Sequence, residues 1–343
     1  MVKATIDDVA ALAGVSIKTV SRVVNKEPNV RQVTREKVQE AIARLDYRPN
    51  ASARSLAGNR SYVLGLLYGA PSANYVIDVQ VGVLNLCRPQ GYDLLIHPCD
   101  YRSEKLPDEI AEMVHQKRID GIILTPPLTD HMEVLAVLQR LKVPFVRIAP
   151  TLNKDMSPYV ETNDREAAYD MTCQLIAMGH REIAFITGHP DHRAVVRRFD
   201  GYRAALEEHN IPLRDELVEN GLNSFASGEA CARRLLAKNP RPSAVFAAND
   251  DMAAAVMMVA HQQGIKIPAQ LSVAGFDDNP VAHQIWPALT TVRQPVQQMA
   301  RKAADLLLKC LRGKETQLPP GVLSSSLILR DSTGPLVVSP TES

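Results

Sequence analysis

Short apolar runs alternate with longer amphipathic stretches throughout the chain after residue 61. In the longer stretches, apolar residues recur at the three- and four-residue spacing of a helix over about 12–18 residues. The short runs are typical of buried strands. They span residues 62–68, 93–98, 121–126, 144–149, 183–188, 244–249 and 272–278. Continuous apolar strands separated by helices predict parallel sheets covered on both faces, here in two doubly wound α/β lobes.

The first 50 residues follow a different, all-helical pattern. Thr5 can cap a helix in which Asp8 occupies the third position, and Gly14 can end that helix. Ser16 can cap a second helix immediately afterwards, and a third helix fits Thr34–Leu45. Two short helices joined by a glycine turn predict a helix-turn-helix.

The second predicted helix has one apolar face and one mainly polar face. Val20, Val23 and Val24 can pack inward. The opposite face carries an ammonium, a guanidinium, an amide and a hydroxyl, which are groups that read base edges and bind phosphates. Its residues are Ile17, Lys18, Ser21, Arg22 and Asn25. The spacing alone also fits a small three-helix bundle with a solvated face.

A short segment after Pro49 has helix signals at both ends. Asn50 can begin and Gly58 can end a helix of about two turns, which is too short to be stable by itself. Such a segment is expected to order against a partner or DNA. Leu56 would then be an exposed apolar side chain suited to wedge into a base step of the minor groove. A linker with an incidental leucine is the alternative.

The charge distribution separates this head from the rest of the chain. Residues 1–60 hold eleven Lys and Arg against six Asp and Glu, a net charge of +5 in a chain whose total is +1. The remaining residues therefore carry −4. A basic head on a mildly acidic body predicts that only the head contacts a polyanion such as double-stranded DNA.

Several other classes of protein do not fit the sequence. The five cysteines form no CxxC pair, the start lacks the apolar core of a secretory signal, and no run of about 18 apolar residues occurs. We therefore expect a cytoplasmic protein without a membrane span. The chain has no P-loop and no G-x-S-x-G motif, so we predict neither an enzyme nor a cofactor. The H-P-D-H run at 189–192 matches no common zinc spacing and is interpreted as a surface loop.

Three polar residues follow predicted strands of the second lobe. Arg198 comes after the strand at 183–188, while Asn249 and Asp277 end the strands at 244–249 and 272–278. Ligands of parallel sheets bind at the carboxyl ends of the strands. A guanidinium, an amide and a carboxylate in one cleft suit a polyhydroxylated ligand, whose hydroxyls donate and accept hydrogen bonds. Capping or salt bridging is the alternative role for each residue.

The head also resembles a known family. The segments TIDDVAALAGVSIKTVSRVVN and TREKVQEAIARLDYRPNASARSLAG are similar to the head and hinge of the LacI/GalR family of bacterial transcription repressors. The resemblance implies that Ile17, Lys18, Ser21 and Arg22 read the major groove. It implies further that paired hinge helices enter the minor groove, with Leu56 opening the central step. The whole set of DNA-binding residues that we predict is Thr5, Ser16, Ile17, Lys18, Thr19, Ser21, Arg22, Asn25, Thr34, Tyr47, Asn50, Ala53 and Leu56.

The body resembles the effector-binding core of the same family, which shares its fold with periplasmic sugar-binding proteins. The similar segments are MGHREIAFITG, RRFDGYRAAL, AVFAANDDMAAAVM, LSVAGFDD and LTTVRQP. Asn223 departs from the family, whose members often have a ligand-stacking aromatic there. This departure and the pair Tyr75-Val76 favour a sugar over a purine. The implied effector contacts are Tyr75, Asp164, Arg198, Asn223, Phe225, Asn249, Asp277 and Gln294.

The resemblance implies a complete domain plan. Residues 1–49 would form the DNA-binding domain, 50–60 the hinge helix, and 61–343 a core for effector binding and dimerisation. We expect a homodimeric repressor of carbohydrate-use genes that binds a pseudo-palindromic operator and a mono-, di- or oligosaccharide. The tail lacks leucine heptads, which argues against a tetramerising coiled coil. The alternatives are a transport sugar-binding protein and a regulator that responds to a nucleoside or a phosphorylated metabolite.

Overall fold

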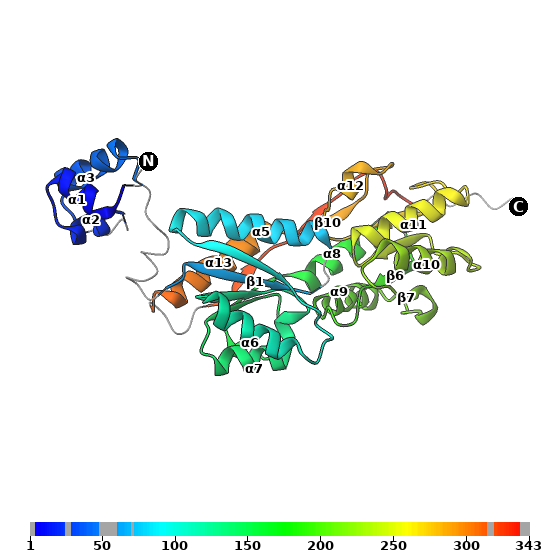
Figure 1. Cartoon of the computed structure of the whole chain (residues 1–343). Helices are drawn as coiled ribbons and strands as arrows, with labels where there is room; N and C mark the ends of the chain where they lie inside the picture. The colour runs from blue at the N-terminus through cyan, green and yellow to red at the C-terminus, as the bar shows by residue number, and fades with distance from the viewer. Residues whose placement is uncertain (1–3, 25–28, 48–59, 70–71, 314–318, 337–343) are drawn as a thin grey trace, which may run out of the picture. The chain divides into compact units, whose positions relative to one another are not determined.

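The computed structural model of the chain forms two compact units, Met1–Tyr62 and Val63–Ser343 (Figure 1). It describes residues 4–24, 29–47, 60–69, 72–313 and 319–336. The predicted hinge helix lies almost entirely outside these ranges. Four of the predicted DNA-binding residues also lie outside them: Asn25, Asn50, Ala53 and Leu56.

The described part of the first unit contains three helices, α1 (Ile6–Ala13), α2 (Ile17–Val24) and α3 (Gln32–Arg44). Thr5 and Asp8 form a reciprocal capping box at the start of α1, which satisfies amides that have no partner within the helix. Gly14 ends α1 in the left-handed region, with a φ of 65°, where glycine lacks the steric cost of a side chain. The predicted helix-turn-helix is therefore present, and α3 begins two residues earlier than expected.

A small valine core holds the three helices together. Val9 of α1, Val20 of α2 and Val38 of α3 are fully buried, and Val23 is nearly so. Val24 is half-buried at the edge of this cluster. The inward packing predicted for the valines of α2 is confirmed, and it turns the opposite face of that helix toward solvent.

The first lobe of the second unit is built on a six-stranded parallel sheet. Its strand order is β11-β5-β4-β3-β1-β2. Figure 1 shows α5 and α13 on one face of this sheet and α6 and α7 on the other. The strands are β1 (Val63–Tyr68), β2 (Asp93–Pro98), β3 (Gly121–Leu124), β4 (Phe145–Ile148), β5 (Tyr159–Thr162) and β11 (Gly321–Leu323). The helices are α5 (Ala73–Cys87), α6 (Leu106–Lys117), α7 (Met132–Arg140) and α13 (Val296–Leu311).

The second lobe repeats this architecture on a four-stranded parallel sheet of order β7-β6-β8-β9. Its core includes Phe185, whose ring lies 4.9 Å from that of Tyr202 and 5.2 Å from that of Phe246. The strands are β6 (Ile183–Thr187), β7 (Val218–Asn220), β8 (Ala244–Ala247) and β9 (Ser272–Ala274). The helices are α8 (Asp164–Ala177), α9 (Ala194–Glu208), α10 (Phe225–Leu236), α11 (Asp250–Gln262) and α12 (Val281–Gln284).

The chain passes between the two lobes more than once. It leaves the first sheet after β5, returns through β10 (Thr291–Arg293) into α13, and crosses again from β11 to β12 (Ser326–Ile328). β10 and β12 pair antiparallel, with Arg293 opposite Ser326. The Ser325 amide donates to Asn163 Oδ1 at 2.7 Å, so two crossing segments are joined.

All seven predicted strands are present, and together they form the two predicted parallel-sheet lobes. The sequence patterns did not reveal β5, β7, β10, β11 and β12, each of only three or four residues. Within the described ranges, no helix is both long and apolar enough to cross a bilayer.

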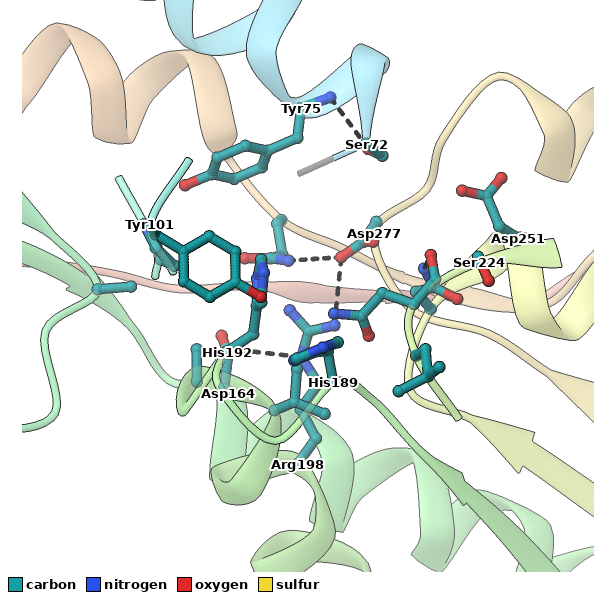
Figure 2. Close-up of a pocket in the computed structure, with 18 of the residues that line it drawn as sticks. Ser72, Tyr75, Tyr101, Asp164, His189, His192, Arg198, Ser224, Asp251 and Asp277 are labelled. Atoms are coloured by element: carbon teal, nitrogen blue, oxygen red, sulfur yellow. Dashed lines mark hydrogen bonds and ion pairs between the residues drawn. The ribbon is translucent and has the colours of Figure 1, made fainter. Parts of the chain in front are cut away.

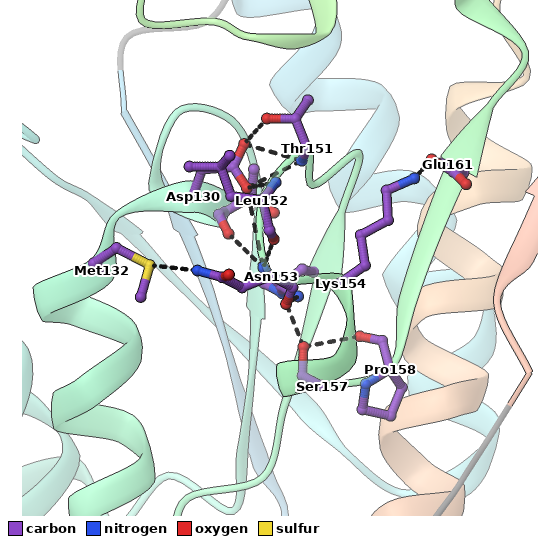
Figure 3. Close-up of polar contacts among 11 residues, drawn as sticks. Asp130, Met132, Thr151, Leu152, Asn153, Lys154, Ser157, Pro158 and Glu161 are labelled. Carbon is purple, nitrogen blue, oxygen red and sulfur yellow. Dashed lines mark hydrogen bonds and ion pairs between the residues drawn. The ribbon is translucent and has the colours of Figure 1, made fainter.

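A fully buried arginine orders the loop after β4. Arg147 Nε donates to Ser157 Oγ at 3.0 Å, and its two terminal nitrogens donate to the carbonyls of Leu152, at 2.9 Å, and Asn153. Asp130 accepts the amides of Thr151 and Leu152 from the other side of the loop (Figure 3). The loop thus replaces the hydration of the buried guanidinium with fixed carbonyl dipoles.

Replacing Arg147 with alanine should destabilise the protein. The Arg147→Ala variant leaves several buried oxygens without donors, and we expect the free energy of unfolding to fall by about 3 kcal/mol. Urea denaturation followed by circular dichroism measures this change. The control Arg140→Ala removes an exposed arginine of α7 and should stay within about 0.5 kcal/mol of the wild type. Equal losses in both variants would contradict the structural role of Arg147.

Candidate functional site

The exposed face of α2 is the first candidate site. Ile17 is 47% exposed, Lys18 and Arg22 are exposed, and Ser21 is half-buried. These four side chains lie on the side of the helix away from the valine core, as the periodicity predicts. An exposed isoleucine beside two cations is typical of a surface that meets a polyanion and also reads apolar groups such as the thymine methyl.

Other predicted DNA-binding residues of the head have structural contacts. The Thr5 hydroxyl donates to Asp8 at 2.8 Å, and Ser16 Oγ accepts the Thr19 amide at 3.2 Å at the start of α2. Thr34 is half-buried, and Tyr47 packs against the edge of the valine core. These contacts position the helices, and a role in DNA binding stays a prediction for each residue.

The second candidate site is a pocket of about 800 Å³ in the second unit. It lies at the carboxyl ends of strands from both sheets, where ligands of parallel sheets bind. Figure 2 shows side chains from several of these strand ends pointing toward one another. All eight predicted effector contacts line this one pocket: Tyr75, Asp164, Arg198, Asn223, Phe225, Asn249, Asp277 and Gln294.

Arg198 lies at the centre of the polar wall. It is 7% exposed, and its Nε donates to Asp164 Oδ2 at 3.1 Å. Its Nη1 donates to the carbonyl of Ala248 and lies 3.4 Å from Asp277 Oδ1. The guanidinium also stacks 3.7 Å from the ring centre of Phe276. Two carboxylates and a carbonyl thus compensate the desolvation of this buried cation.

Asp277 has an unusual backbone and an unusual acidity. Its φ of 115° places it among conformations that side chains rarely adopt, and its amide donates to the Val292 carbonyl at 2.8 Å. Burial raises the pKa of Asp277 to about 6, although Arg198 and the amide of Gln294, 2.6 Å away, favour the charged form. The carboxylate is therefore a strong acceptor for a hydroxyl that enters the pocket.

Asn249 has a capping role in addition to its place in the pocket. Its Oδ1 accepts the Met252 amide at 3.0 Å, which caps α11, and its Nδ2 donates to the Asn223 carbonyl at 3.0 Å. This second bond holds Asn223, which lies in the left-handed region with a φ of 59°. The amide of Asn249 therefore orders the loop that carries Asn223 and Phe225.

Aromatic rings provide the apolar part of the wall. Tyr75 stands in the first turn of α5, where Ser72 caps the helix by accepting the Tyr75 amide at 3.3 Å. Burial raises the pKa of the Tyr75 hydroxyl, so it remains a neutral donor. Phe225 begins α10 and is 42% exposed. A neutral hydroxyl on one ring and an open face on another suit a ligand with both polar and apolar surfaces.

The sequence patterns did not reveal several wall residues, including His189 and His192 of the H-P-D-H run. Residues 189–192 form a loop with exposed positions, as interpreted from the sequence, and the side chains of His189 and His192 also line the pocket. Burial and the neighbouring His189 lower the pKa of His192 to about 4. The signal available in the sequence was the position of this run directly after β6. The other missed wall residues include Tyr101, Arg102 and Asp251.

Two arginines make polar contacts between the lobes beside the pocket. Arg102, which follows β2, lies 2.9 Å from His189 Nε2 and 3.4 Å from Asp191 Oδ2, both of which follow β6. Arg197 of α9 donates to Glu161 of β5 at 2.8 Å. These pairs join groups from the first sheet to groups from the second. Among the described residues, no group of three His, Cys, Asp or Glu side chains is arranged to hold a metal.

Comparisons with known proteins agree with this architecture. The family model "Bacterial regulatory proteins, lacI family" matches residues 5–50, and the model "Periplasmic binding protein-like domain" matches residues 172–333. The HTH-type transcriptional repressor PurR of Vibrio vulnificus is 34% identical over 334 residues, which covers 96% of this chain and 98% of that protein. Catabolite control protein A of Priestia megaterium is 34% identical over 316 residues, covering 91% of this chain and 93% of that protein.

Solved structures show the same similarity. The complex of the transcriptional regulator CelR with cellobiose superposes with a TM-score of 0.75 at 32% identity, over 96% of this chain and 99% of that chain. The lac repressor dimer bound to operator and the anti-inducer ONPF gives a TM-score of 0.77 at 28% identity, over the same shares of both chains.

A helix-turn-helix head joined to a periplasmic-binding-protein-like core is the domain arrangement of a class of DNA-binding transcriptional regulators. The chain belongs to the LacI family of bacterial regulatory proteins. The fold and the family expected from the sequence are thereby confirmed. The relatives are transcriptional regulators and not enzymes. This protein is likewise a transcriptional regulator and not an enzyme.

The raised pKa of Asp277 predicts how stability depends on pH. The folded protein binds this proton more readily than the unfolded chain does, so ionisation of Asp277 lowers stability as the pH rises from about 4 to about 6. The loss attributable to this group is at most about 3 kcal/mol. Asp277→Asn cannot titrate and should flatten this part of the curve.

Urea denaturation at half-unit steps between pH 4 and pH 7 tests this expectation. The control Asp305→Asn removes a partly exposed carboxylate that pairs with Lys309 and should keep the wild-type slope. An identical slope in Asp277→Asn and wild type would show that Asp277 does not titrate in this range.

Proposed function

We propose that the protein is a homodimeric repressor whose affinity for a pseudo-palindromic operator changes when a sugar-like effector occupies the pocket. The observation that carries this proposal is the combination, in one chain, of the exposed face of α2 with the Arg198-centred pocket. A transport sugar-binding protein would have a use for the pocket but none for the helix-turn-helix. A dimer fits the two-fold symmetry of operators that helix-turn-helix proteins bind.

On the DNA side, Ile17, Lys18, Ser21 and Arg22 would contact base edges in the major groove. Asn50, Ala53 and Leu56 would belong to a hinge that enters the minor groove, with Leu56 as the wedge. The head's net charge of +5 supports this assignment, because phosphate contacts dominate the affinity of such proteins.

On the effector side, the wall chemistry supports a saccharide. A carboxylate, a guanidinium and amides lie beside the half-buried Tyr75 and the partly open ring of Phe225. Sugars present hydroxyls at their edges and apolar C–H faces, and so need both kinds of partner. The similarity to the CelR–cellobiose complex gives independent support for a mono-, di- or oligosaccharide. Carbohydrate-use genes would then be the regulated targets.

Effector and operator binding would be coupled through the lobes. The ligand contacts strand ends from both sheets, so its binding would favour one relative orientation of the lobes over another. The coupling free energy is expected to be about 1–3 kcal/mol, and it must act equally in both directions. Equal effector affinity with and without saturating operator would contradict this mechanism.

Arg22→Ala should weaken specific operator binding about tenfold to a hundredfold, because one good base contact contributes roughly 1–3 kcal/mol. Fluorescence anisotropy on duplex DNA from the protein's own promoter, at two salt concentrations, measures the effect. The control Arg44→Ala removes an exposed arginine at the end of α3 and should change affinity much less. Unchanged selectivity in Arg22→Ala would remove this residue from the reading face, and no DNA binding by the wild type would overturn the proposed function.

Arg198→Ala should abolish the effector response while operator affinity remains at the wild-type level. The same anisotropy assay, repeated with a panel of sugars, nucleosides and phosphorylated sugars, shows the response. Gln294→Ala is the milder companion, because it removes a donor to Asp277 without unpairing a buried cation. The exposed Arg203→Ala on the same helix serves as the control. A normal response in both pocket variants would place the effector elsewhere.

A further inference from the structure

The wall of the pocket carries more acidic than basic groups. The carboxylates of Asp100, Asp164, Asp251 and Asp277 line it, against the guanidinium groups of Arg102 and Arg198. Arg198 is already engaged by two of these carboxylates, at 3.1 Å and 3.4 Å. The deepest cation in the pocket is therefore not available to neutralise an anionic ligand.

The other basic wall groups do not reverse this balance. Arg102 lies 3.4 Å from Asp191, a carboxylate of the adjoining loop, and its side chain is 65% exposed. His192 is uncharged at neutral pH, because burial and the neighbouring His189 lower its pKa to about 4. Both guanidinium groups of the wall thus already have anionic partners, and a phosphate group would meet excess negative charge.

Asp251 is a wall carboxylate for which the described residues provide no partner. It is the second residue of α11 and is half-buried, and none of the described residues donates a hydrogen bond to it or forms an ion pair with it. Burial raises its pKa. In Figure 2 its carboxylate lies across the pocket from Tyr75 and Tyr101, beside Ser224.

The start of α11 is held by Asn249 and Asp250, without a contact from the side chain of Asp251 among the described residues. Asp250 is fully buried, and it accepts the Asn279 amide at 2.7 Å and the Thr291 hydroxyl at 2.5 Å. Asn249 caps the helix. Since these two residues secure the helix start, the carboxylate of Asp251 remains open toward the pocket.

We propose that Asp251 is a specificity-determining residue that accepts hydrogen bonds from a hydroxyl or ammonium group of the effector. The pocket would therefore take uncharged or aminated polyols and reject phosphorylated ones. This inference rests on the proposed function and narrows its ligand class. The physical basis is that hydroxyl and ammonium groups donate to a carboxylate, whereas a phosphate only repels it.

Isothermal titration calorimetry on the full-length protein at pH 7 tests the proposal. Neutral mono- and disaccharides are titrated first, and each sugar that binds is followed by its amino-deoxy and phosphorylated derivatives. In the wild type, the phosphorylated derivative should bind at least tenfold more weakly than the parent sugar, and the amino derivative at least as tightly. Asp251→Asn should reduce both differences severalfold, because the amide removes the charge and keeps the shape.

The matched control is Asp108→Asn, which removes an exposed carboxylate from the first turn of α6. It should keep the wild-type ranking of derivatives. A phosphorylated sugar that binds as tightly as its parent, or the same ranking in Asp251→Asn as in wild type, would overturn this inference and leave the proposed function intact. If no sugar binds, both the inference about Asp251 and the proposed sugar effector are wrong.

Discussion

The buried guanidinium of Arg198 is the interaction on which the pocket depends. It connects the first residue of α8, the residue after β8 and the segment after β9, through Asp164, Ala248 and Asp277. These three segments are far apart in the sequence, and beyond the pairing of β8 with β9 they are joined here because one cation needs several oxygens when it leaves water. The groups that would meet a ligand are therefore held in place before the ligand arrives, which lowers the entropic cost of binding.

The same pairing partly compensates the charges at the centre of the pocket. Arg198 stabilises the ionised form of Asp277, while burial opposes it, so that the pKa of this carboxylate lies near 6 rather than far outside the physiological range. The unfavourable backbone of Asp277 is held by the same contacts and by the bond from its amide to Val292. Strain of this kind is often found at ligand sites, where the surrounding structure fixes a conformation that the residue alone would avoid.

Much of the fold was predictable because the strong signals are local. The strands at the centres of the sheets are buried on both faces and appear as continuous apolar runs, as Ile122 and Ile123 of β3 illustrate. β5 was missed because its four residues alternate between buried and half-buried positions and include Glu161. β10 and β12 were missed because a three-residue antiparallel pair between lobes has no periodicity of its own.

The candidate site was predictable to the extent that its residues follow strands or match family motifs. Arg198, Asn249 and Asp277 follow predicted strands. Residues such as Tyr75 were predicted only from the resemblance to the family. Sequence spacing could not predict that Arg102 lies beside His189, because that contact depends on how two separate sheets are placed. Nor could it show that the side-chain amide of Asn249 is used within the fold, since capping and ligand binding favour the same residue type.

The return of the chain to the first lobe has a consequence for biosynthesis. β11 completes the first sheet and α13 covers one of its faces, where Leu307 of α13 packs against Gly121 of β3. A ribosome translating at roughly 5–20 residues per second makes the whole second-lobe sheet before it makes these two elements. The nascent first lobe therefore keeps apolar surface uncovered until α13 has been synthesised. A chain whose translation stops before α13 would keep one face of the first sheet exposed. Such a chain is a target for chaperones and proteases rather than a smaller working regulator.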